Sequence, residues 1–162
     1  MRGGALPPAL LFAALGLALA FAPRRAWMPS LLALLASAGA FSFLPIPRNW
    51  LEGVYLAFWI TVMATAASVH FARGLSHLPV ALVLSLNAGA WASAVVHLSG
   101  SRVDLLSALP CALILLPASW VIDRHTSIPV KVVSSWIIAI AVLAAALQLL
   151  TVTPGYLPDH LE

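Results

Sequence analysis

The sequence predicts an all-α, polytopic integral membrane protein: a helical bundle of six transmembrane helices, with five as the alternative. Hydrophobic residues make up 62% of the 162-residue chain, charged residues only 8%, and the mean hydropathy is +1.03. Soluble domains carry about 25% charged residues and leave a large part of their surface in water. So much apolar surface requires lipid as its solvent, and the lipid bilayer is therefore the first expected partner.

Six apolar stretches have the length of a membrane-crossing helix, which needs about 20 mostly apolar residues. They are 6–22, 27–45, 50–72, 77–99, 103–122 and 129–150. Proline, glycine and charged residues separate them, and such residues end helices. We expect one domain over 1–152, in which short connections make consecutive helices antiparallel neighbours, followed by a short tail over 153–162.

The first segment follows Arg2 and has the apolar character of a secretory signal. However, Pro23-Arg24-Arg25 follows it in place of a small-residue cleavage site, so we expect a mature helix over 6–22. Trp27 and Trp50 open the second and third segments, and Trp120 lies near the end of the fifth. Indole rings favour the membrane interface, so these positions agree with the expected helix ends.

The fifth segment, 103–122, contains Pro110 and Pro117. Each proline removes a backbone donor, so we expect a kinked or broken helix. Transporters often bind substrates at broken helices near the midplane, although proline is also frequent in membrane helices generally.

Basic residues set the expected orientation. Six crossings place five of them on one face, Arg24, Arg25, Arg73, Arg124 and Lys131, and the other three on the opposite face, Arg2, Arg48 and Arg102. The positive-inside rule assigns the first face to the cytoplasm of a bacterial inner membrane and both termini to the periplasm. These charges are too scattered to follow a phosphate backbone, so no nucleic-acid partner is expected.

The middle parts of the segments hold neutral polar residues and no Asp, Glu, Lys or Arg. In lipid each polar group needs a partner. One interpretation is hydrogen bonding between helices, and the other is a polar pocket for a small neutral or weakly polar solute. Asn87 and Thr61 lie at nearly equal depth, as do Trp59 and Trp91. The candidate binding residues are Asn87, Thr61, Thr65, Ser85, Ser134, Ser135, Trp59 and Trp91.

Three histidines, His70, His77 and His125, share the expected cytoplasmic face and form a candidate haem or metal site. Cys111 is the only cysteine, so the chain has no Cys-x-x-Cys-His attachment sequence and no cysteine-based zinc spacing. We therefore expect no cofactor, with haem as the alternative.

Three functional hypotheses follow. The leading one is a small bacterial membrane protein that binds or transports a small neutral solute. The alternative is a non-catalytic subunit or assembly factor of a larger membrane complex, or a homo-oligomer, because Gly16/Ala20, Ala36/Ala40 and Gly89/Ser93 have the four-residue spacing of close helix packing. A haem or metal protein is the third. No phosphate loop, nucleophile elbow or pair of carboxylates indicates an enzyme.

Overall fold

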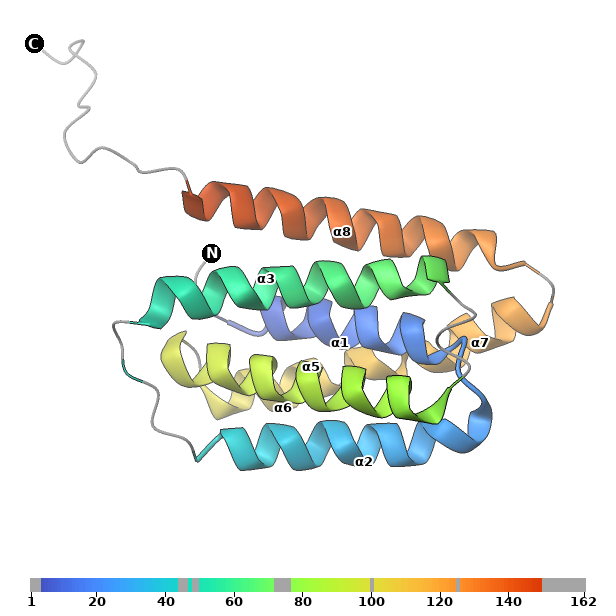
Figure 1. The fold of residues 1–162 in the computed structure, drawn as a ribbon, viewed down its shortest axis with the longest axis horizontal. Helices are drawn as coiled ribbons and strands as arrows, with labels where there is room; N and C mark the ends of the chain where they lie inside the picture. Colours follow the sequence, from blue (N-terminus) through green and yellow to red (C-terminus); the bar gives the residue numbers. More distant parts are fainter. Residues whose placement is uncertain are drawn as a thin grey trace, which may run out of the picture.

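The computed structural model describes residues 4–43, 47, 50–71, 77–99, 101–124 and 126–149. The expected tail over 153–162 and His125 lie outside these ranges. Within them the chain forms helices and no strand, which confirms the predicted all-α bundle (Figure 1). The elements are α1 (Leu6–Leu19), α2 (Arg24–Phe41), α3 (Leu51–Ser68) with η2 (Val69–Phe71), α5 (Leu78–Ser99), α6 (Arg102–Ala108), η3 (Leu109–Ile114), α7 (Leu115–Asp123) and α8 (Ile128–Leu149).

Four helical stretches in the described part of the chain are long and apolar enough to cross a membrane. They are Leu51–Phe71, Leu78–Leu98, Val103–Asp123 and Ile128–Leu149. The first apolar segment forms the shorter α1, and α2 begins with two arginines, which lower its hydropathy. The protein is therefore a membrane helical bundle in which the first two helices are the least typical spans.

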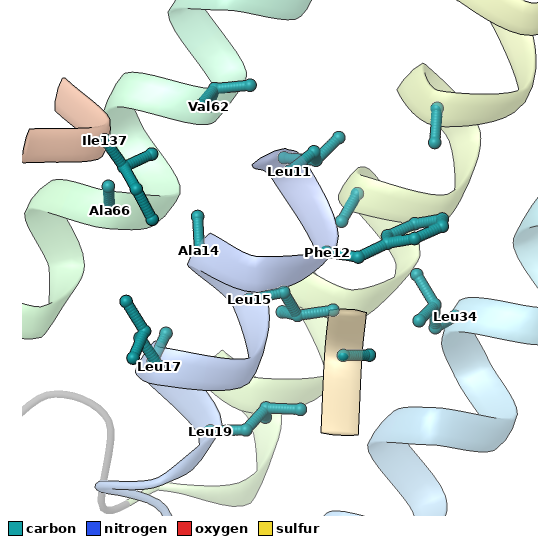
Figure 2. Close-up of a cluster of buried hydrophobic side chains, with 14 of the residues drawn as sticks. Leu11, Phe12, Ala14, Leu15, Leu17, Leu19, Leu34, Val62, Ala66 and Ile137 are labelled. Atoms are coloured by element: carbon teal, nitrogen blue, oxygen red, sulfur yellow. The ribbon is translucent and has the colours of Figure 1, made fainter. Parts of the chain in front are cut away.

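Helix α1 lies at the centre of the bundle, surrounded by α3, α5 and the α6–η3–α7 segment (Figure 1). Its 14 residues include no polar side chain, and Leu11, Phe12 and Leu15 are fully buried. Phe12 and Ala14 leave α1 on opposite sides, so side chains pack all around it (Figure 2). At about 1.5 Å per residue α1 is roughly 21 Å long, shorter than the ~30 Å hydrocarbon core, so it is a buried central helix.

The fifth apolar segment changes from α-helix to 3-10 helix at Leu109–Ile114 and returns to α-helix at Leu115. Pro110 is the second residue of η3, and Pro117 lies in the first turn of α7, where no helical partner for its nitrogen is needed. Gly16 lets α1 approach this segment, because a Cβ there would lie 2.7 Å from the Ala112 carbonyl oxygen.

Helices α2 and α5 form a tightly packed parallel pair. Ser42 Oγ and Ser93 Oγ lie 2.9 Å apart and share a hydrogen bond, while Gly89 lies against Ser37 and Ala38, one turn earlier on both helices. The expectation that consecutive helices are neighbours is wrong for α2. Among the described residues α2 packs mainly on α5, and its contacts with α1 and α3 are minor, because small side chains permit the closer approach to α5.

Helix α8 lies at the opposite edge of the bundle and packs mainly on α3 (Figure 1). Buried Ser134 on α8 donates a hydrogen bond of 2.6 Å from its Oγ to the Ala66 carbonyl oxygen on α3. The outer face of α8 exposes large apolar side chains, including Trp136, Leu143 and Leu147. This face is suited to contact with lipid.

Candidate functional site

The structure divides the predicted midplane residues between the interior and the surface. Thr61, Thr65, Ser85 and Ser134 are buried, whereas Asn87 and Ser135 are exposed. Equal depth therefore did not place Thr61 and Asn87 on facing surfaces, because depth leaves the rotation of each helix about its axis open.

The four buried hydroxyls differ in their hydrogen bonding, and within the described helices only that of Ser134 bonds to another helix. Thr61 Oγ1 donates to the carbonyl oxygen of Ala57, one turn earlier, at 2.9 Å. Thr65 and Ser85 are fully buried, and neither hydroxyl has a hydrogen-bond partner among the residues that the structure describes. A helical Ser or Thr can reach a carbonyl in its own preceding turn by rotating χ1, so such a hydroxyl needs no bound solute.

The two deep tryptophans do not form a stacked pair. Trp59 is buried, and its ring meets Phe58 edge-on with centroids 5.3 Å apart. Its Nε1 has no hydrogen-bond partner in the described ranges. Trp91 is half-buried on α5. Trp59 therefore belongs to the packed interior rather than to an aromatic clamp.

Asn87 is the polar residue with the least favourable surroundings. It is the tenth residue of the 22-residue α5 and lies close to the middle of the Leu78–Leu98 span. Its side chain is exposed beside Leu86 and one turn from Val83, which are 46% and 63% exposed, and no hydrogen bond joins it to any described residue. The α5 face formed by Val83, Leu86 and Asn87 thus carries an exposed carboxamide close to the middle of a helix that is long and apolar enough to cross a membrane.

The candidate histidine site is only partly described. His70 and His77 are exposed, and Ser135 Oγ lies 3.5 Å from His70 Nε2. His125 lies outside the described ranges. Among the residues that the structure describes, no group of three or more His, Cys, Asp or Glu side chains is placed to hold a metal ion.

A charged cavity, which the sequence analysis did not predict, lies where the α1–α2 connection meets α7. We call it the Arg25 cavity. Its volume is about 440 Å³, and one ion pair crosses it, with Arg24 Nη2 2.8 Å from Asp123 Oδ2. The lining residues are Ala20, Phe21, Ala22, Pro23, Arg24, Arg25, Trp27, Ser119, Ile122 and Asp123.

Local sequence explains how the cavity is built. Pro23 is the N-cap of α2, with φ −61° and ψ 141°, so the helix begins at Arg24 instead of the predicted Trp27. The Trp27 indole donates to the carbonyl oxygens of Leu19 and Ala22 at 3.1 and 3.3 Å, which fixes the link between α1 and α2. Counting the predicted crossings places the start of the second helix and the end of the fifth on the same face of the membrane. This shared face was the one feature of the sequence that could have indicated the cavity.

A smaller cavity of about 200 Å³ lies at the other end of the bundle, between the start of α3 and the end of α8. Neither cavity is lined by the predicted midplane residues. The lining residues here are Leu51, Glu52, Gly53, Tyr55, Leu56, Gln148 and Leu149.

Fold and site together define the class: a membrane helical bundle with an exposed carboxamide on α5 and a charged cavity at one end. Comparison with known families, curated proteins and solved structures finds no match to this chain.

Proposed function

We propose that this protein is a non-catalytic subunit of a membrane assembly, joined to its neighbour through the α5 face that Val83, Leu86 and Asn87 form. The observation that carries the proposal is the exposed carboxamide of Asn87, close to the middle of a candidate membrane span and without a hydrogen bond to any described residue. An unsatisfied polar group in hydrocarbon costs several kcal/mol, and a neighbouring transmembrane helix can remove that cost by hydrogen bonding.

We propose that the partner is a second copy of this chain. A carboxamide carries both donors and acceptors, so two Asn87 side chains across a two-fold axis can satisfy each other. Symmetric dimers are the commonest oligomers, and their interfaces are self-complementary. The apolar neighbours Val83 and Leu86 would enclose the amide pair and keep lipid away from it.

The solute-binding hypothesis has less support. It requires the midplane polar residues to face one space, whereas Asn87 is exposed and Thr61 is bonded within its own helix. Thr65 and Ser85 remain its strongest residues, because their buried hydroxyls lack hydrogen-bond partners in the part of the chain that the structure describes.

The proposal includes a location. Arg24, Arg25, Arg124 and Lys131 occur at helix ends on one side of the bundle, and the positive-inside rule assigns that side to the cytoplasm. We propose a bacterial inner membrane, with both termini in the periplasm.

The test measures self-association of the full chain in lipid vesicles by energy transfer between labelled copies, as the protein-to-lipid ratio is varied. Two hydrogen bonds of about 0.6–1.7 kcal/mol each correspond to roughly a tenfold or greater change in the dimer constant. Asn87→Leu should weaken association by about that factor, and Asn87→Gln, which keeps the carboxamide, should weaken it less. Ala139→Leu, on the exposed face of α8, is the matched control and should have no effect.

Two outcomes would overturn the interface. One is a wild-type chain that stays monomeric at every ratio. The other is a dimer that tolerates Asn87→Leu but is lost in Gly39→Leu. Exposed Gly39 lies on α2, so this result would place the interface on α2 instead of α5. Co-purification with a different membrane protein, abolished by Asn87→Leu, would support the α5 face as an assembly surface and would refute the second copy as its partner.

A further inference from the structure

The Arg25 cavity carries an uncompensated positive charge. Two guanidinium groups and one carboxylate line it, and the carboxylate of Asp123 is bonded to Arg24 at 2.8 Å. Arg25 is exposed and has no ion pair or hydrogen bond to any described residue. Arg124, which directly follows Asp123 in the sequence, lies 3.9 Å above the ring centroid of Trp120 and outside the lining. Within the described part of the chain, Arg25 is thus the cation of the cavity that has no partner.

The start of α2 adds to this positive potential. Arg24 and Arg25 are the first two residues of the helix, its first turn has no acidic residue, and its N-cap Pro23 makes no side-chain hydrogen bond. The first backbone N–H groups of a helix lack helical acceptors and carry partial positive charge. An arginine at the start of a helix is electrostatically unfavourable unless an anion is close by. Asp123 compensates the charge of Arg24 and leaves that of Arg25 uncompensated.

The remaining walls are those of an interfacial site. Phe21 and Ile122 supply apolar surface, and the Trp27 indole is held by two carbonyl oxygens. The volume of about 440 Å³ is of the size that small-molecule sites commonly have. The cavity lies at the ends of α1, α2 and α7, where a membrane bundle meets lipid headgroups.

We infer that the Arg25 cavity binds a phosphate group, held by the Arg25 guanidinium and the first N–H groups of α2. A guanidinium presents parallel N–H donors that match two phosphate oxygens, and a helix N-terminus favours the same anion. The single unneutralised charge matches the one negative charge of a phosphodiester, as in a glycerophospholipid headgroup. A soluble phosphate is the other source of the same chemistry. This inference uses a different part of the molecule from the α5 face and does not depend on it.

The experiment measures binding to the full chain in a detergent with an uncharged headgroup. Native mass spectrometry would count bound phosphatidylglycerol as its concentration rises, and a parallel titration would use inorganic phosphate. Arg25→Gln should weaken the binding of the preferred phosphate by about tenfold, which is the usual scale for losing a charge-assisted hydrogen bond. Arg25→Lys keeps the positive charge but lacks the planar guanidinium, so its affinity for the phosphate should lie between those of the wild type and Arg25→Gln.

Lys131→Gln is the matched control. It removes one positive charge from the same end of the bundle, on α8 and outside the cavity lining. Saturable lipid binding that depends on Arg25 and resists inorganic phosphate identifies the headgroup as the source. Arg25-dependent binding of inorganic phosphate without a lipid preference identifies the soluble source. Equal losses in Arg25→Gln and Lys131→Gln, or no loss in Arg25→Gln, would overturn the inference.

Discussion

Gly89 lies at the closest approach of α2 and α5, and Gly89→Ala tests whether this crossing stabilises the bundle. The added Cβ would meet the Ser37 hydroxyl and the Leu34 carbonyl oxygen at less than van der Waals distance, and would lie 3.0 Å from the Ala38 nitrogen. Ser37 can rotate, but the other two atoms belong to the backbone of α2. The two helices must therefore move apart, which also strains the hydrogen bond between Ser42 and Ser93.

The expected magnitude is the balance of two effects. Overpacking in a well-packed interior costs about 1–3 kcal/mol. Replacing glycine by alanine inside a helix returns up to about 1 kcal/mol through helix propensity. We expect Gly89→Ala to lower the free energy of unfolding by about 1–2 kcal/mol, measured by titrating the purified protein in mild detergent with a denaturing surfactant and following helix content.

Gly39→Ala and Gly53→Ala are the matched controls, because a Cβ at either position meets nothing within 4 Å. Both substitutions should be neutral or stabilising by up to about 1 kcal/mol. If Gly89→Ala unfolds at the same surfactant fraction as these two, the close approach of α2 and α5 is not a stabilising contact and the argument from small residues fails.

Two further substitutions test the buried hydroxyls by the same unfolding measurement. Ser134→Ala removes the 2.6 Å hydrogen bond to the Ala66 carbonyl oxygen and should cost about 0.6–1.7 kcal/mol, whereas exposed Ser135→Ala should change stability by less than about 0.5 kcal/mol. Thr65→Val exchanges an unpartnered buried hydroxyl for a methyl of similar shape and should be neutral or stabilising by up to about 1 kcal/mol. A clear loss of stability in Thr65→Val would contradict this expectation and would mean that the hydroxyl makes a stabilising hydrogen bond in the folded protein.

The sequence predicted the fold class because hydropathy measures the solvent that a segment needs. The expected helices over 77–99 and 129–150 are close to the observed Leu78–Ser99 and Ile128–Leu149. The start of α2 was placed too late, at Trp27, because a hydropathy argument excludes Arg24 and Arg25 even where the helix continues beyond the hydrocarbon.

The sequence could not assign the faces of the helices. Asn87 has a predictable depth, since depth follows from counting residues along one helix, but its exposure depends on how α5 is rotated against α2 and α3. The central position of α1 was equally hidden. A segment without polar side chains is expected both for a helix in lipid and for one buried in protein, so polarity does not separate the two.

The short length of α1 connects the fold to the Arg25 cavity. Because α1 ends at Leu19, the chain between it and α2 is non-helical and lies beside α7. Irregular backbone is tolerated at membrane depth only where protein or water satisfies its polar groups, and here the Trp27 indole donates to two of the carbonyl oxygens. The same short link forms one wall of the cavity and places the start of α2, with Arg25, at its edge. A longer α1 would fill this space with helix, so the cavity follows from a central helix that is shorter than the hydrocarbon core.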